Sequence, residues 1–554
     1  MFSNKKSIQQ LVALMLDYGV VDVVLSPGSR NAPLIHTFTQ HGGFRCHTIV
    51  DERSAAYFAL GMILQLKKPV AICCTSGTAL LNYSSAAAEA FYQKLPLLVI
   101  SADRPAHWVG QADGQTINQK NVLANFVKKS VTLPEVTSTE DAWLCNRLIN
   151  ESLIALTRKD AGPVHLNLPL SEPLYEFTEA SISAVRRISL VEGKALLPNS
   201  YAEKWSSAPK RMVILGQHAP DVAVEQLAAA LSQRNDVVVI AEHTANVPSA
   251  YSIAYFEQVL MSMDRSEEMH FCPDLLITIG GHVVSKRLKL LLRRNKPQMH
   301  WHIGPEVVDT YQCITSLLDI ELSSFTDTLA MLTAGDSSFK HLWSERAAML
   351  ARRSSQLVGG IAYSDLKVYS SLFDKLPEGI SLHLGNSSPV RYAQLFGLPE
   401  NVEVYSNRGT SGIDGSLSTF MGFASLSERL SLLIIGELSF LYDSNGLWTR
   451  YTSPNARILV VNNSGGGIFR LIDGPSKSQA LEQHIEYRHE QSVELIAKAF
   501  GLAYLSAKNE EELQTKLPKL LDKELGQATV LEVFTPYAEN SAIYKSYIEN
   551  LKTK

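Results

Sequence analysis

Apolar residues along the chain form short continuous runs that alternate with segments of helical spacing. The first runs occupy residues 21–26, 46–50, 69–76, 96–101 and 164–169. Strands that are buried on both faces of a parallel sheet read as continuous apolar runs, and alternation with helices is typical of α/β proteins. The pattern therefore predicts a parallel sheet with helices on both faces.

Two further series of the same kind follow. The second has runs at 211–217, 236–242, 274–281 and 299–304. The third has runs at 381–387, 402–407, 430–437, 456–463 and 529–535. We predict an α/β protein of three successive parallel-sheet domains, at residues 1–180, 205–335 and 360–554. The polar stretch 176–208, which has no clear period, is interpreted as a linker.

Composition narrows the functional classes. The 554 residues are 45% hydrophobic and 19% charged, which is typical of a globular protein. Lys plus Arg total 51 against 55 for Asp plus Glu, which argues against a nucleic-acid or anionic-lipid surface. The six cysteines include no C-x-x-C pair, and no run of 18 apolar residues predicts a membrane span. Because residues 1–19 lack a signal-peptide pattern, we expect a cytoplasmic protein.

Two runs of the third series end in oxygen-bearing residues. Gly436 and Glu437 end one run, and Asn463 ends the next, 26 residues after Glu437 and before a glycine-rich turn. Adjacent parallel strands would bring these ends together. Glu437, the amide oxygen of Asn463 and a carbonyl such as that of Gly465 would then supply the hard ligands that Mg²⁺ prefers. The alternative is that Glu437 only places negative charge at a helix N-terminus.

This pair resembles the signature of thiamine-diphosphate enzymes, in which Gly-Asp-Gly is followed by Asn-Asn. Here Glu437 replaces the Asp, and Leu438 replaces the second Gly. The resemblance implies a glutamate in the first domain that activates the cofactor's aminopyrimidine, and Glu52, after the run 46–50, is the candidate. An acidic residue at this place also stabilises the first turn of a helix without any catalytic role.

Basic and polar side chains follow several predicted strands in all three series. They are Ser29, Arg30, Arg104, Gln115, Lys286, Arg287, Arg391 and Arg408. A guanidinium group binds a carboxylate through two hydrogen bonds, so such a set favours a pocket for dicarboxylate small molecules. Any one of these arginines taken alone is more often a surface ion-pair partner.

The motifs SPGSRNAPL (26–34), DERSAAYFALG (51–61), YSNRGTSGIDG (405–415) and NNSGGGIF (462–469) together resemble one family. It is the 2-succinyl-5-enolpyruvyl-6-hydroxy-3-cyclohexene-1-carboxylate synthases, thiamine-diphosphate enzymes of menaquinone biosynthesis. The resemblance implies decarboxylation of 2-oxoglutarate and 1,4-addition of the remaining four-carbon unit to isochorismate.

The resemblance also implies site residues, with Glu52 as the catalytic activator. The implied cofactor contacts are Glu52, Ser387, Ile413, Gly436, Ser439 and Ile468. The implied ligands of Mg²⁺ or Mn²⁺ are Glu437, Asn463 and Gly465. The implied substrate contacts are Ser29, Arg30, Arg104, Gln115, Lys286, Arg287, Arg391, Arg408 and Phe469. No histidine is assigned, and a homodimer or homotetramer with interchain active sites is implied.

Two other functions are compatible with parts of this pattern. One is another thiamine-diphosphate decarboxylase or carboligase, such as an acetohydroxyacid synthase, although the basic residues at the strand ends argue against a pyruvate-sized pocket. The other is a non-catalytic nucleotide-binding protein with three Rossmann-like sheets, although the chain has no clean G-x-G-x-x-G fingerprint.

Overall fold

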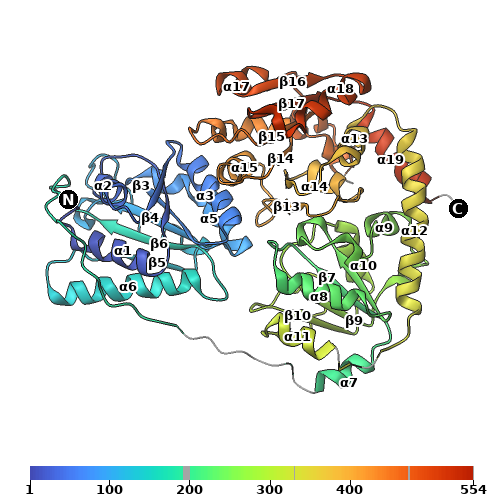
Figure 1. The fold of residues 1–554 in the computed structure, drawn as a ribbon, viewed down its shortest axis with the longest axis horizontal. Helices are drawn as coiled ribbons and strands as arrows, with labels where there is room; N and C mark the ends of the chain where they lie inside the picture. Colours follow the sequence, from blue (N-terminus) through green and yellow to red (C-terminus); the bar gives the residue numbers. More distant parts are fainter. Residues whose placement is uncertain (191–196, 198–199, 330, 333, 472–473, 553–554) are drawn as a thin grey trace. The chain divides into compact units, whose positions relative to one another are not determined.

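The computed structural model describes residues 1–190, 197, 200–329, 331–332, 334–471 and 474–552. Its strands form three sheets, and every pairing with a described register is parallel (Figure 1). The α/β class and the three parallel sheets expected from the sequence are therefore confirmed. No described helix is long and apolar enough to cross a membrane.

The first sheet has the strand order β2–β1–β3–β4–β6–β5. Its strands are β1 (Asp22–Leu25), β2 (Arg45–Thr48), β3 (Val70–Cys74), β4 (Leu97–Asp103), β5 (Lys129–Thr132) and β6 (Val164–Pro169). The helices of this region are α1 (Lys6–Asp17), α2 (Ala32–Gln40), α3 (Glu52–Leu66), α4 (Thr78–Asn82), α5 (Ser84–Gln93) and α6 (Thr139–Thr157). Side chains of α1, α2 and α6 share one hydrophobic cluster with the sheet.

The second sheet has the order β11–β10–β9–β7–β8. Its strands are β7 (Arg211–Leu215), β8 (Val237–Ala241), β9 (Leu275–Ile279), β10 (Met299–Ile303) and β11 (Ser316–Leu318). The helices here are α7 (Ser200–Ser206), α8 (Val222–Ser232), α9 (Phe256–Ser262), α10 (Lys286–Arg294), α11 (Leu322–Leu329) and α12 (Ser338–Gly359). Helix α7 lies in the stretch interpreted as a linker, where its Trp205 is buried; residues 191–196 and 198–199 of that stretch lie outside the described residues.

The third sheet has the order β13–β12–β14–β15–β17–β16. Its strands are β12 (Ser381–Leu384), β13 (Glu403–Tyr405), β14 (Ser431–Gly436), β15 (Ala456–Asn462), β16 (Ala503–Ala507) and β17 (Thr529–Phe534). The helices are α13 (Asp365–Lys375), α14 (Ser388–Ala393), α15 (Ser416–Ala424), α16 (Glu437–Tyr442), α17 (Glu494–Ala499), α18 (Glu510–Leu520) and α19 (Asn540–Lys552).

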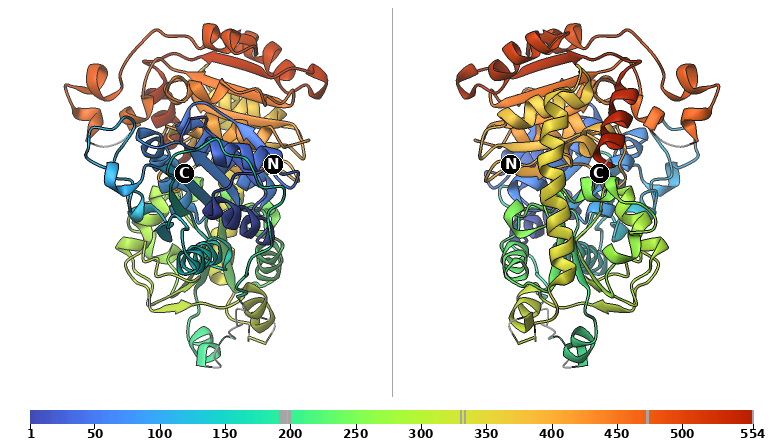
Figure 2. Two further views of the ribbon diagram at one scale, coloured as in Figure 1. Left: turned by 90° about the vertical axis from the view of Figure 1, so that its left-hand side faces the viewer. Right: turned by 90° about the vertical axis from the view of Figure 1, so that its right-hand side faces the viewer.

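The described residues form two compact units. The first unit contains residues 1–191, 407–428 and 439–456, and the second contains 192–406, 429–438 and 457–554. Within the second unit, one hydrophobic cluster joins residues of the second and third sheets, and the long helix α12 contributes to it. In Figure 2, α12 is the long yellow helix. This shared core groups two sheets in one unit, so the division into three domains stays a prediction.

Helices α3 and α15 pack against each other within the first unit at two glycines. A Cβ atom at Gly61 would lie 2.0 Å from the carbonyl oxygen of Thr419, and one at Gly422 would lie 2.0 Å from that of Phe58. These distances are far below van der Waals contact, so the two backbones touch. Only glycine permits this close approach at both positions.

We therefore expect Gly61→Ala to destabilise the first unit by about 2 kcal/mol, the usual cost of overpacking a core. Urea unfolding followed by circular dichroism measures the change. Gly42→Ala is the matched control, because nothing lies within 4 Å of the added carbon. Equal midpoints for the two variants would contradict the close packing of α3 and α15.

Candidate functional site

The carboxyl ends of β14 and β15 lie side by side in the third sheet. Gly436 ends β14 and Glu437 begins α16, whereas Asn462 ends β15 and Asn463 follows it. The backbone N–H of Gly465 donates to Oε1 of Glu437 at 2.6 Å. The structure thus brings the glutamate and the glycine-rich turn together.

The Glu437 carboxylate is buried, with 2% of the residue exposed. Besides the Gly465 N–H, its Oε1 faces Nε2 of His489 at 3.4 Å. Because Nδ1 of His489 accepts a hydrogen bond from the N–H of Gln491, Nε2 carries the proton in the neutral ring. The Gly465 N–H is therefore the hydrogen-bond donor to Oε1, with His489 close by, and Oε2 remains for a ligand.

The amide of Asn463 has one occupied and one unoccupied end. Its Nδ2 donates to Oδ2 of Asp365 at 2.8 Å, whereas its Oδ1 is buried without a hydrogen-bond partner. The carbonyl of Gly465 accepts one bond, from the N–H of Gly467 at 2.9 Å, and keeps a second lone pair. These oxygens fit a hard divalent cation. The described residues contain no cluster of three His, Cys, Asp or Glu side chains suited to a metal, as expected for such a mixed set.

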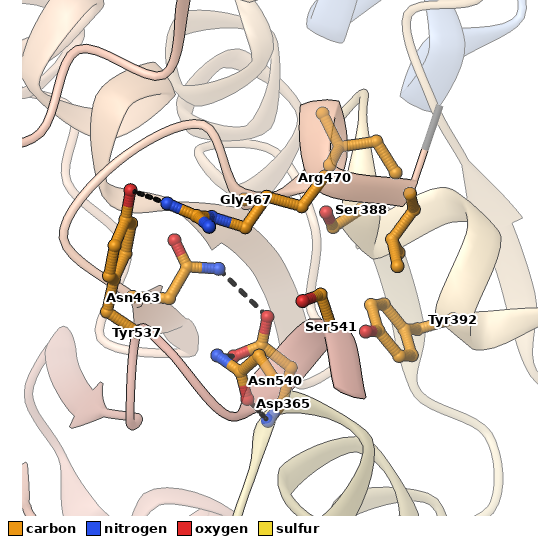
Figure 3. Close-up of a pocket in the computed structure, with 11 residues that line it drawn as sticks. Asp365, Ser388, Tyr392, Asn463, Gly467, Arg470, Tyr537, Asn540 and Ser541 are labelled. Carbon is orange, nitrogen blue, oxygen red and sulfur yellow. Dashed lines mark hydrogen bonds between the residues drawn. The ribbon is translucent and has the colours of Figure 1, made fainter. Parts of the chain in front are cut away.

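Asp365, the first residue of α13, faces Asn463 and is buried (Figure 3). Burial raises the pKa of its carboxyl to about 6, and the nearby charge of Glu437 acts in the same direction. Hydrogen bonds from Thr535, Asn463 and Asn540 partly offset this rise, because they favour the ionised carboxylate.

A small pocket opens beside this pair. It is lined in part by Asp365, Asn463, Ile468 and Arg470 (Figure 3). Arg470 forms ion pairs with Glu482 at 3.0 Å and with Glu486 at 2.8 Å. The structure therefore places Ile468 in a pocket with one candidate metal ligand, Asn463, and Phe469 lies in the same 3₁₀ turn, Gly467–Leu471.

Glu52 begins α3 in the first unit and is half-buried. Burial chiefly raises the pKa of the Cys74 thiol and of the Tyr83 phenol, and the charge of Glu52 adds to both shifts. The carboxylate therefore lies near the end of β3. The Tyr83 hydroxyl donates to Ser26 at 2.9 Å, so the end of β1 belongs to the same neighbourhood.

The loop at 407–415 belongs to the first unit and is held by Glu89. The buried carboxylate of Glu89 accepts from the N–H groups of Gly409 at 2.7 Å and Thr410 at 2.6 Å. The preceding residue, Arg408, is buried, whereas Ile413 is 38% exposed.

Ser439 joins this loop through its side chain. Its hydroxyl donates to the carbonyl oxygen of Ile413 at 2.8 Å. The structure thus brings together two of the expected cofactor contacts. An exposed branched apolar side chain in a loop held by hydrogen bonds suits contact with a ligand.

The basic residues of the first unit are engaged by neighbouring groups. Arg30 is buried, donates to the carbonyl of Leu170 at 2.8 Å and pairs with Glu172 at 3.1 Å. Arg104 pairs with Asp113 at 3.2 Å. The remaining two expected contacts of this unit, Ser29 and Gln115, are exposed.

In the second unit, Arg287 and Arg391 share a neighbourhood with Glu257 and Tyr544. Arg287 pairs with Glu257 at 2.9 Å, and this negative charge raises its pKa against the opposing effect of burial. Burial lowers the pKa of Arg391, and the charges of Tyr544 and Glu257 oppose that shift. Lys286, at the start of α10, is exposed.

Ser387 precedes α14 and has a left-handed φ of 72°. Its carbonyl accepts a bond from Nη1 of Arg391 at 2.5 Å. The structure therefore joins an expected cofactor contact to an expected substrate contact through one backbone turn.

Three residues of these clusters were not predicted from the sequence. No motif defines the spacing between Asn463 and His489. Asp365 looks like an ordinary acidic residue in a first helical turn, and Glu89 lies inside an alanine-rich helix. One sequence signal could have pointed to Asp365. The Ser364-Asp365 pair is typical of a helix start, and this helix precedes the predicted strand at 381–387.

Comparison with known proteins defines the class. Residues 6–122 match the family described as thiamine pyrophosphate enzyme, N-terminal TPP binding domain. With its three parallel sheets, the chain is therefore a thiamine-pyrophosphate enzyme of α/β fold.

The full chain is similar to curated proteins with one name, 2-succinyl-5-enolpyruvyl-6-hydroxy-3-cyclohexene-1-carboxylate synthase. The protein of Bacteroides thetaiotaomicron is 42% identical over 100% of both chains. That of Flavobacterium psychrophilum is 39% identical over 98% of both, and that of Desulfotalea psychrophila is 40% identical over 90% of this chain and 93% of its own. The chain belongs to the 2-succinyl-5-enolpyruvyl-6-hydroxy-3-cyclohexene-1-carboxylate synthase family.

The buried position of Glu437 predicts the effect of its removal. We expect Glu437→Ala to weaken Mg²⁺ binding in the presence of thiamine diphosphate by about tenfold or more, because a charged oxygen ligand is lost. Isothermal titration calorimetry measures the affinity. Glu494→Ala, which removes a partly exposed glutamate of α17, should bind Mg²⁺ like the parent. Unchanged affinity in Glu437→Ala would show that Glu437 is no metal ligand.

Proposed function

We propose that the protein is a thiamine-diphosphate-dependent transferase that joins 2-oxoglutarate to isochorismate with loss of CO₂. The product is 2-succinyl-5-enolpyruvyl-6-hydroxy-3-cyclohexene-1-carboxylate, an intermediate of menaquinone biosynthesis. The supporting observation is the convergence of Glu437 and Asn463 at one sheet edge, with a buried amide oxygen that lacks a partner. A cytoplasmic location is part of this proposal.

The residues present suit the cofactor and its metal. Oε2 of Glu437, Oδ1 of Asn463 and the Gly465 carbonyl would hold Mg²⁺ or Mn²⁺, with Gly436 leaving space beside the metal. Ser387 and Ser439 would contact the diphosphate, and Ile413 would support the cofactor from below. When bound, thiamine diphosphate supplies a nucleophilic carbon and an electron sink for decarboxylation.

The side chains around the substrates bind and orient them in this proposal. Glu52 would hydrogen-bond the aminopyrimidine and would hold the proton that promotes its imino form. Both substrates are dicarboxylates, and the basic and polar residues would orient their carboxylates and hydroxyls. These residues are Ser29, Arg30, Arg104, Gln115, Lys286, Arg287, Arg391 and Arg408. Ile468 and Phe469 would form an apolar wall that limits access of water.

The alternative of an acetohydroxyacid-synthase-like enzyme is not favoured. The full-length relatives are named 2-succinyl-5-enolpyruvyl-6-hydroxy-3-cyclohexene-1-carboxylate synthase instead. A substrate comparison tests the choice directly. With thiamine diphosphate and Mg²⁺, we expect CO₂ release and product formation from 2-oxoglutarate plus isochorismate, and none from pyruvate. Turnover of pyruvate at a comparable rate would overturn the proposal.

The role of Glu52 gives a second test. We expect Glu52→Gln to retain thiamine diphosphate, measured by calorimetry, but to lower kcat by about 10³-fold, because the amide cannot exchange the proton. Glu140→Gln is the matched control, since Glu140 is an exposed acid in the first turn of α6. Near-normal turnover in Glu52→Gln would remove the assignment.

We also propose a homodimer, or a homotetramer built from it, in which Glu52 of one chain and Glu437 of another serve the same active site. Mixing Glu52→Gln chains with Glu437→Ala chains, at a Mg²⁺ concentration at which neither variant alone turns over, tests this arrangement. In random dimers half of the molecules are hybrids with one intact site, so about a quarter of the parent activity should return. No recovery after verified subunit exchange would place both residues in one chain.

A further inference from the structure

Asp365 and Asn463 form a buried pair at the sheet edge that carries the candidate metal ligands (Figure 3). Asp365 begins α13, and Asn463 follows β15. The Nδ2 group of Asn463 donates to Oδ2 of Asp365 at 2.8 Å. Asp365 is separated from Asn463 by 98 positions in the sequence, so only the fold creates this contact.

The pair has one favourable arrangement. A carboxylate accepts hydrogen bonds and cannot donate them, so it binds the NH₂ end of an amide and repels the carbonyl end. The Oδ1 atom of Asn463 therefore points away from Asp365, where it is buried and has no hydrogen-bond partner. Such an unpaired buried acceptor suits a ligand, and a divalent cation would supply the missing partner.

Asp365 is itself held in place by further bonds. Its Oδ1 accepts from the Thr535 hydroxyl at 2.6 Å and from Nδ2 of Asn540 at 3.0 Å. Its backbone N–H donates to Oδ1 of Asn540 at 2.8 Å. Thr535 follows β17 and is tied to β15 by its N–H, which donates to the Asn462 carbonyl. The carboxylate cannot rotate without breaking several of these bonds.

We propose that Asp365 is a positioning residue for the metal site, which selects the amide orientation in which Oδ1 of Asn463 faces the divalent cation. The inference rests on the proposed function in taking Asn463 as a metal ligand. Groups that orient metal ligands through hydrogen bonds commonly matter for metal affinity almost as much as the ligands.

The Asp365→Asn variant reverses the preference of the pair. Thr535 and Asn540 both donate hydrogen bonds to residue 365, so the amide oxygen of the new side chain takes the place of Oδ1. The NH₂ group of the new side chain then faces Asn463. Asn463 then turns its oxygen toward that group and presents its own NH₂ to the cation. We expect Mn²⁺ affinity to fall by about tenfold or more. Electron paramagnetic resonance of free Mn²⁺, with thiamine diphosphate present, measures the affinity without reference to turnover.

An exchange of the two side chains separates orientation from packing. In the double variant Asp365→Asn/Asn463→Asp, the new carboxylate accepts from the new amide with one oxygen and offers the other to the cation. We expect Mn²⁺ affinity to return to within about threefold of the parent. Thr535→Val is the packing control, because it removes a bond to Asp365 but leaves the bond to Asn463, and its affinity should not change.

The outcomes distinguish this inference from the proposed function. If the parent protein binds no Mn²⁺ with thiamine diphosphate, the metal site of the proposed function fails. If the parent binds but Asp365→Asn binds equally well, or the exchange restores nothing, the role of Asp365 is wrong. If Asp365→Asn does not fold, the double variant decides alone: affinity near that of the parent supports the inference, and loss of binding overturns it.

Discussion

The 2.6 Å hydrogen bond from the Gly465 N–H to Glu437 is the contact on which the site depends. It joins the turns that follow two neighbouring parallel strands, and it occupies one oxygen of a buried carboxylate. Parallel strands make such a contact possible because their carboxyl ends all lie at one edge of the sheet. A one-strand change in the order of the third sheet would separate the two turns and leave no paired oxygen ligands.

Further polar groups lie against the candidate ligands. In the described part of the chain, His489 and Gly465 both face one oxygen of Glu437, and Asp365 binds the NH₂ end of Asn463. The glutamate side chain has one more methylene than the aspartate side chain, so the position of its carboxylate depends more on the groups that contact it. The longer side chain of Glu437 is held by the hydrogen bond from the Gly465 N–H, with His489 beside it.

A similar principle operates in the first unit. The backbone of Gly409 and Thr410 is fixed by the buried carboxylate of Glu89, and Ser439 holds the carbonyl of Ile413. These bonds place an exposed apolar side chain on a stiff loop.

The sequence by itself determined the three parallel sheets and the positions of their central strands, because a strand buried on both faces must be continuously apolar. It did not reveal β5, β11 and β16, which lie at sheet edges and are only partly buried. Nor did it reveal the break at Tyr83 that divides α4 from α5.

For the site, the chain order was enough to suggest that Glu437 and Asn463 converge, since both follow strands of one series. Only the tertiary structure decided that Asp365 and His489 join them, because those contacts link segments whose separation along the chain follows no period. Local sequence patterns encode burial and backbone geometry, whereas hydrogen bonds between distant loops are set by how the sheets and helices pack.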